Sequence, residues 1–159
     1  MDEAPAVVVV GAACRDLVDD DERGWRLGGG ASYSALALAR LGIRVGALVV
    51  ADELATSSRE LNTIRDAGVD VRVIPGSRGP IFINIETPTG RIQQTPQVSD
   101  AVDPGALPPG WRDARAWVFA PVAAEVRDEW ADIPRPDALV ALGWQGLLRV
   151  LRDGAPVHH

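Results

Sequence analysis

The sequence contains no lysine: its 16 basic side chains, all of them arginine, stand against 22 carboxylates. The resulting net charge of −6, with no basic stripe along the chain, argues against nucleic-acid binding. Long apolar runs are also missing, which argues against a membrane-spanning segment, and no secretory leader is recognisable. We therefore expect neither a nucleic acid nor a membrane as a partner.

Cysteine and histidine are almost absent as well. The single cysteine, Cys14, cannot form an internal disulfide, which is typical of proteins from a reducing compartment and predicts a cytoplasmic location. His158 and His159 have no accompanying ligand residues, so no metal site is predicted.

What the chain does contain is an alternation of buried strands and helices. The length of 159 residues, 47% of them hydrophobic, suits one globular domain. Continuous apolar runs predict strands at 7–13 and 45–51, and a third strand is predicted at 69–74. Helices are predicted at 32–41 and 53–67, each followed by a glycine. This order is the signature of an α/β fold with a parallel sheet.

The pattern changes after residue 80. Isoleucine alternates with other residues from position 81, the turn residues Thr-Pro-Thr-Gly follow at 87–90, and a second strand returns to residue 95. This period-two pattern predicts a β-hairpin over 81–95 that stands apart from the main sheet. Two further buried strands are predicted at 116–122 and 138–142, with a short helix at 123–131 between them.

Three consecutive glycines, residues 28–30, precede the first predicted helix. One interpretation is a dinucleotide-binding turn in a Rossmann-type domain, with 24–27 as its strand and Asp52 as the ribose-binding acid. Tyr33 argues against it, because it occupies the position of the third glycine of that fingerprint. A second interpretation is a tight turn that only lets the helix pack closely.

A third interpretation is a resemblance to the PfkB or ribokinase-like carbohydrate kinases. It depends on four segments in the family's order: VVVVGAACRD at 7–16, GGGASYSALALARLG followed by VGALVVAD at 28–52, DAGVDVRVI at 66–74 and GPIFINIETPTGRIQ at 79–93. The resemblance implies a three-layer α/β fold with a mainly parallel sheet and a small β-hairpin lid. Residues 1–159 would form the N-terminal part of such a domain, with lid elements at about 23–29 and 79–97.

The resemblance also implies an activity, the transfer of the γ-phosphoryl group of ATP to a hydroxyl of a sugar or polyol. ATP and Mg²⁺ are the cofactors that it implies. Asp16 matches the acid that accepts hydrogen bonds from substrate hydroxyls, a role that suits a carboxylate with two acceptor oxygens. The substrate-binding residues that we expect on this basis are Asp16, Gly28, Gly29, Gly30, Ser32, Tyr33 and Glu125.

Three departures from the family pattern concern the substrate pocket. Tyr33 and Cys14 stand where the family usually has asparagine, and Ala51 where it usually has glycine. An aromatic residue at the position of Tyr33 resembles the branch that includes inositol kinases, which favours a cyclic polyol as the small-molecule partner. Lid strands of the family often pair between subunits, so a homodimer through the hairpin, with Ile81, Ile83 and Ile85, is a further expectation.

The family's catalytic motif, Gly-Ala-Gly-Asp, has no counterpart in this sequence. Family members are much longer, and their catalytic Asp and nucleotide-binding loops lie in the second half. We therefore expect no catalytic residue in this chain, and expect it to be the inactive, substrate-side part of a kinase that lacks the C-terminal nucleotide-binding half. Two alternatives stay open: a non-catalytic binding or interaction module with this fold, and the dinucleotide-binding domain.

Overall fold

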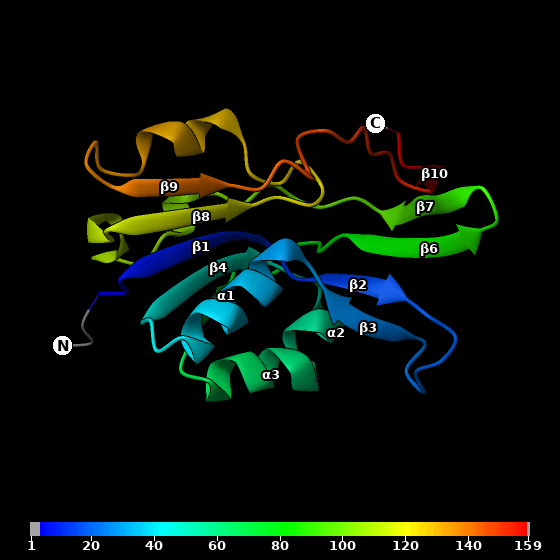
Figure 1. Ribbon diagram of the computed structural model, residues 1–159, viewed down its shortest axis with the longest axis horizontal. Helices are drawn as coiled ribbons and strands as arrows, with labels where there is room; N and C mark the ends of the chain where they lie inside the picture. The colour runs from blue at the N-terminus through cyan, green and yellow to red at the C-terminus, as the bar shows by residue number, and fades with distance from the viewer. Residues whose placement is uncertain (1–3, 159) are drawn as a thin grey trace.

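The structure is a computed structural model, described for residues 4–158, so His159 lies outside the described residues. Its main sheet has five parallel strands in the order β5-β4-β1-β8-β9 (Figure 1). The strands are β1 (Val7–Ala12), β4 (Val45–Val50), β5 (Asp70–Val73), β8 (Ala116–Ala120) and β9 (Leu139–Leu142). The predicted parallel α/β sheet is confirmed.

A second sheet of five strands extends from one end of the first and has the order β10-β7-β6-β2-β3 (Figure 1). Its strands are β2 (Cys14–Leu17), β3 (Trp25–Gly28), β6 (Ile81–Thr87), β7 (Gly90–Gln97) and β10 (Ala155–Pro156). The predicted hairpin at 81–95 is the antiparallel pair β6–β7, and it lies outside the main sheet as expected. We refer to this second sheet as the lid sheet.

The helices differ from the prediction at two places. Helix α1 (Gly30–Arg40) agrees with the prediction, but the single helix expected over 53–67 is two helices, α2 (Glu53–Thr56) and α3 (Arg59–Asp66). The chain is interrupted because Ser58 starts a new helix, with its hydroxyl accepting from the Leu61 amide at 3.1 Å.

The helix expected over 123–131 is also wrong. That segment starts with a tight turn, in which Ala124 adopts a positive φ of 57°, and only the 3₁₀ helix η3 (Asp128–Asp132) follows. Two other short 3₁₀ helices lie before β8: η1 (Pro104–Ala106) and η2 (Trp111–Asp113). Positive φ is unfavourable for a residue with a Cβ, so the turn excludes a regular helix there.

Both faces of the central strand β1 are covered, and every residue of β1 is buried. Val7 and Val9 belong to the cluster that α1 and α3 cover, and Val8 and Val10 belong to the cluster on the opposite face. The second cluster is rich in aromatic side chains: Trp111, Trp117, Phe119 and Trp130. This alternation explains why β1 reads as a continuous apolar run. No helix among residues 4–158 has the length and apolar character needed to cross a bilayer.

Strand β9 contradicts the prediction of a buried strand at 138–142. All four of its residues are exposed, because β9 is the edge strand of the main sheet and its faces are only partly covered. Leu139 is 73% exposed and Trp144, just beyond the strand, is 63% exposed. We call this surface the β9 patch; it comprises Leu139, Val140, Leu142, Trp144, Leu147, Leu148 and Val150.

We expect the β9 patch to bind a hydrophobic fluorescent dye in solution, because an exposed apolar surface of this kind is unusual on a monomer. Replacing Leu142 and Leu147 together by Lys should reduce the dye fluorescence by roughly half or more. Leu41→Lys is the matched control, since Leu41 is as exposed but lies at the end of α1. Equal loss of fluorescence in the control would show that the dye binds elsewhere.

Candidate functional site

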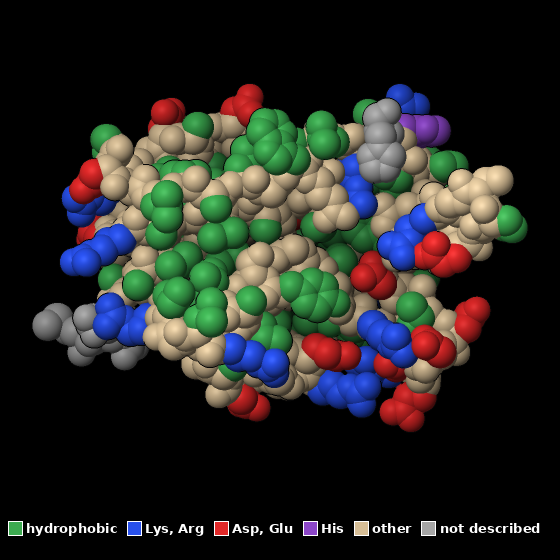
Figure 2. Space-filling view, viewed as in Figure 1, with side chains coloured by type: hydrophobic (Ala, Val, Ile, Leu, Met, Phe, Trp, Pro, Cys, Tyr) green, Lys and Arg blue, Asp and Glu red, His purple; other side chains and the backbone are tan. Residues whose placement is uncertain are grey.

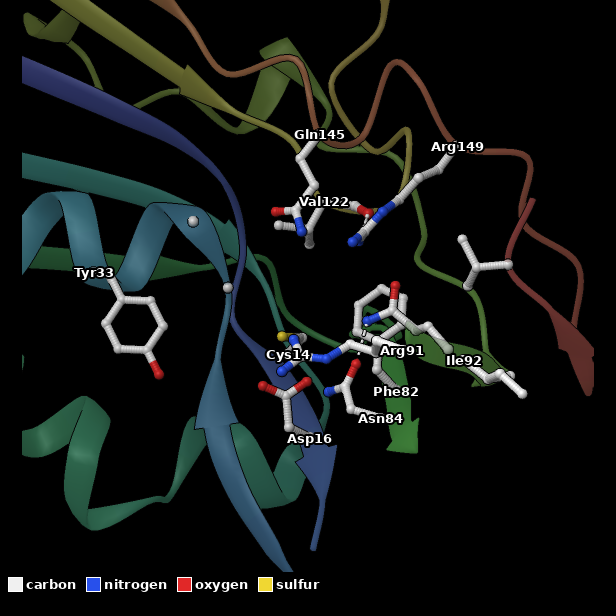
Figure 3. A pocket seen from close by; sticks show the side chains of 14 residues that line it. Cys14, Asp16, Tyr33, Phe82, Asn84, Arg91, Ile92, Val122, Gln145 and Arg149 are labelled. Atoms are coloured by element: carbon white, nitrogen blue, oxygen red, sulfur yellow. Dashed lines mark hydrogen bonds between the residues drawn. The ribbon is translucent and has the colours of Figure 1, made fainter. Parts of the chain in front are cut away.

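A cavity of about 520 Å³ lies where the main sheet meets the lid sheet (Figure 3). Its walls come from segments that are far apart in the sequence: β2, the turn before α1, the hairpin β6–β7, and the loop that follows β9. Its polar lining consists of the side chains of Asp16, Tyr33, Asn84, Arg91, Gln93, Gln145 and Arg149. The cavity therefore offers both hydrogen-bond acceptors and donors to a ligand.

The three glycines lie beside this cavity, and a Cβ on any of them would meet a close neighbour, with the backbone contact at Gly29 the tightest. A Cβ on Gly28 would lie 2.3 Å from Asp16 Oδ2, and one on Gly29 would lie 2.1 Å from the Ala12 carbonyl oxygen. Gly29 also has a φ of 105°, and it is the N-cap of α1 without a side-chain cap. At Gly30, a Cβ would lie 3.2 Å from the Ala120 carbonyl oxygen. The glycines thus let α1 begin directly against the ends of β1 and β8.

Asp16 is the carboxylate of the cavity. It lies on β2, and no residue within 4–158 forms a hydrogen bond or an ion pair with its side chain. Burial raises the pKa of Asp16, while the nearby guanidinium groups of Arg149 and Arg91 act in the opposite direction. An unpaired, partly buried carboxylate is unfavourable in the free protein, so a ligand that donates hydrogen bonds would find an acceptor ready.

Arg149 and Gln145 form the opposite wall (Figure 3). Arg149 donates to the Val122 carbonyl at 3.2 Å, and its guanidinium lies 5.6 Å from the centre of the Phe82 ring. With its oxygen turned toward Arg149, the Gln145 amide accepts from both terminal nitrogens, at 2.6 and 3.2 Å. Burial lowers the pKa of Arg149. All these partners are neutral, so the guanidinium keeps its charge available to the cavity.

The lid hairpin contributes amide side chains to the same cavity. Gln93 donates to the Asn84 side-chain oxygen at 2.7 Å across the β6–β7 pair, and both residues line the cavity. Sequence reasoning missed Asn84, Gln93, Gln145 and Arg149, because no local motif marks them. For Asn84 the one available signal was its place in the alternating pattern of β6, and that pattern indicated a strand rather than a site.

The expected site residues are only partly brought together. Asp16, Gly29, Gly30 and Tyr33 line the cavity, but Gly28, Ser32 and Glu125 do not. Ser32 is buried in the first turn of α1 with its hydroxyl unpaired, and Glu125 is 1% exposed.

Tyr33 lies at the rim. Its side chain is largely exposed, and its hydroxyl donates to the Leu27 carbonyl at 3.2 Å.

The dinucleotide-binding interpretation is wrong. Strand β3, which precedes the glycines, pairs antiparallel with β2 in the lid sheet and is not a strand of the parallel sheet. Asp52, the proposed ribose-binding acid, accepts from the Ala55 amide at 2.9 Å as the N-cap of α2 and pairs with Arg15 at 2.6 Å. Both oxygens of its carboxylate are therefore engaged within the fold.

Ion pairs fix the β2–β3 hairpin to the helices beneath it. Arg23 contacts Glu60 of α3 at 2.6 Å and Asp21 of the hairpin at 3.0 Å, and Arg15 of β2 contacts Asp52. Figure 2 shows acidic and basic side chains gathered over this end of the molecule, at the lower right. These contacts hold the hairpin that bears Asp16 against α3 and the start of α2.

Comparisons with known proteins agree with this architecture. No family model and no curated protein matches the sequence. Among solved structures, a pyrophosphate-dependent kinase of the ribokinase family, complexed with a pyrophosphate analogue and myo-inositol, matches with a TM-score of 0.74 and 19% identity. The match covers 94% of this chain and 53% of that chain.

Two other ribokinase-like structures match less closely. The nucleoside kinase of Methanocaldococcus jannaschii has a TM-score of 0.65 and 14% identity, covering 92% of this chain and 55% of its own. The PfkB protein of Polaromonas sp. JS666 has a TM-score of 0.53 and 21% identity, covering 72% and 44%. This chain thus has the α/β fold of the ribokinase-family kinases, over about half the length of those proteins.

Proposed function

We propose that this chain binds the acceptor of a phosphotransfer reaction, a sugar or cyclic polyol, in the cavity between its two sheets. The observation that supports this most is the unpaired carboxylate of Asp16 in a cavity whose other wall presents the donors of Arg149 and Gln145. Each hydroxyl of a polyol can donate to a carboxylate and accept from a guanidinium or amide. A ring with hydroxyls around its edge would satisfy both walls at once.

A cyclic polyol is the acceptor that we favour. Asn84 and Gln93 of the lid hairpin would add side-chain amides, and Phe82 and Ile92 would contact the apolar face of a ring. The solved kinase with a TM-score of 0.74 is complexed with myo-inositol, which makes myo-inositol the first compound to test.

The phosphoryl donor would be bound by polypeptide other than this chain. ATP with Mg²⁺ is the donor that the sequence resemblance implies, and the matched inositol-bound kinase is pyrophosphate-dependent. Residues 4–158 contain no group of three or more His, Cys, Asp or Glu side chains suited to a metal ion. They do not fit Mg²⁺, so the proposal assigns to this chain the binding and orientation of the acceptor and no chemical step. A catalytic base and the amides that stabilise the transferred phosphoryl group would have to be added.

The alternative is a binding module that uses the same cavity without any phosphotransfer.

We also propose a cytoplasmic location, based on the single buried Cys14, and a homodimer through the lid hairpin. In such a dimer the two subunits would contact each other through the faces of their lid sheets, because β10 pairs with the outer edge of β7. Sedimentation analysis of the chain, with Ile85→Lys as the variant on the exposed part of β6, would test the dimer.

Calorimetric titration of the purified chain tests the proposed function. We expect saturable binding of myo-inositol or another polyol, and no transfer of phosphate from ATP or pyrophosphate with Mg²⁺ in the same sample, because one missing oxyanion-stabilising group alone costs roughly a hundred- to a thousandfold in rate. Absence of binding by myo-inositol, ribose, fructose and a nucleoside would contradict the acceptor site. Turnover by the pure chain would show that it contains catalytic residues that we have not identified.

A further inference from the structure

Glu125 is the most deeply buried carboxylate in the described part of the chain, and no basic side chain pairs with it. Its partners are backbone amides: Val122 N–H lies 3.0 and 3.1 Å from its two oxygens, and Ala123 N–H lies 2.7 Å from one of them. Burying an ionisable group without an opposite charge is costly. A carboxylate at this position should therefore have a role that a neutral side chain would not fulfil as well.

The amides that Glu125 accepts from belong to a strained turn. Ala124, between Ala123 and Glu125, has the positive φ of 57° that few residues with a Cβ adopt. Such a conformation persists only where surrounding contacts impose it. Here the Glu125 carboxylate imposes the conformation of Ala124, since it holds the Val122 and Ala123 amides on the inside of the turn.

This turn supports the segment that bears the donors of the cavity. The Val122 carbonyl accepts from Arg149 at 3.2 Å, and the Pro121 carbonyl accepts from the Gly146 amide at 2.8 Å. Gly146 lies so close that a Cβ on it would be 2.6 Å from the Pro121 carbonyl carbon. Gln145 and Arg149 thus lie on either side of Gly146, whose backbone contacts the backbone of Pro121. Glu125 fixes the conformation of the segment that follows Pro121.

We infer that Glu125 is a positioning residue for the acceptor site: its carboxylate fixes the turn at 121–125, whose carbonyls hold Arg149 toward the cavity. The role of Glu125 in acceptor binding rests on the proposed function, but its effect on the position of Arg149 does not depend on any ligand. It also replaces the sequence-based expectation that Glu125 contacts the substrate, since Glu125 does not line the cavity. The ionisable groups that interact electrostatically with Glu125 are Cys14 and Arg149.

The test compares Glu125→Ala and Glu125→Gln with Glu129→Gln, an exposed glutamate of η3, as the control. The first readout needs no ligand: hydrogen exchange, by NMR, of the Arg149 Nη1–H group that donates to the Val122 carbonyl, assigned with Arg149→Lys. We expect exchange about tenfold faster or more in Glu125→Ala, and a smaller increase in Glu125→Gln, whose amide oxygen can still accept from both backbone amides. The control should exchange like the wild type.

The second readout is calorimetric titration with myo-inositol. We expect a dissociation constant at least about tenfold higher in Glu125→Ala if the wild type binds. Folded variants with unchanged Arg149 exchange would overturn the inference and leave Glu125 as a residue that only stabilises the turn. If Glu125→Ala does not fold, Glu125→Gln decides by the same exchange measurement. A wild type that binds no polyol would contradict the proposed function, and the Arg149 exchange would still decide this inference.

Discussion

Asp16→Asn should weaken polyol binding by roughly 2–4 kcal/mol, which is about thirty- to several-hundred-fold in the dissociation constant. The substitution preserves the shape of the side chain but replaces one acceptor oxygen by an N–H donor. Hydroxyls that already donate to Asp16 would then face a second donor. The charge-assisted hydrogen bonds of the carboxylate would be lost as well, and calorimetric titration of the variant measures both effects.

The stability of Asp16→Asn separates a binding role from a structural one. Burial raises the pKa of Asp16, so the folded state favours the protonated carboxyl more than the unfolded state does. Raising the pH from the unfolded value through the folded one therefore costs stability, and that cost is fully present at neutral pH. We expect Asp16→Asn to unfold at the same temperature as the wild type or slightly above it at pH 7.

The control for this prediction is Asp19→Asn. Asp19 is an exposed carboxylate of the same hairpin and does not line the cavity, so its replacement should change neither affinity nor stability. If Asp16→Asn binds the polyol as tightly as the wild type, the acceptor site is not at Asp16. In that case the glycines beside it would serve only the start of α1.

Gly29→Ala should be the most destabilising single substitution near the site. The added Cβ would lie 2.1 Å from the Ala12 carbonyl oxygen, in a backbone with a φ of 105°. Neither partner is a flexible side chain: the contact joins α1 to the end of β1, the central strand of the main sheet. We expect a loss of roughly 3–5 kcal/mol in the free energy of unfolding, because steric overlap and conformational strain add together.

Gly42→Ala isolates the conformational part of that effect. Gly42 also has a positive φ, of 79°, but a Cβ there would meet nothing within 4 Å. Its replacement should cost about 1 kcal/mol. Chemical denaturation of both variants measures the difference, and equal losses would show that the close approach of Ala12 does not restrict residue 29.

Local patterns in the sequence were sufficient for much of the fold. The apolar run of β1 predicts a strand covered on both faces, and Val7 to Val10 do alternate between two clusters. The hairpin β6–β7 follows from its period-two pattern and its Thr-Pro-Thr-Gly turn. These features depend on neighbours a few residues apart, so the sequence shows them directly.

Other features depend on which segments meet in space. The run at 138–142 predicts a strand, but whether a second layer covers it is decided by the topology, which leaves β9 at an edge. Glu125 reads as a pocket residue because it follows a strand end, yet its carboxylate turns inward to the amides of its own turn. Periodicity does not encode either outcome, because both are settled by packing against distant parts of the chain.

The sequence by itself therefore determined the α/β class, the lid hairpin and the glycine turn. It also indicated Asp16 as a candidate residue, which lies within β2 and lines the cavity. Only the tertiary structure decided that Gln145 and Arg149 lie across a cavity from Asp16, and that Glu125 binds the backbone amide of Val122, whose carbonyl accepts from Arg149. The physical reason is that strand and turn preferences act between near neighbours in the chain. A binding site, in contrast, forms where the ends of several strands converge, and that convergence depends on the order of the strands in both sheets.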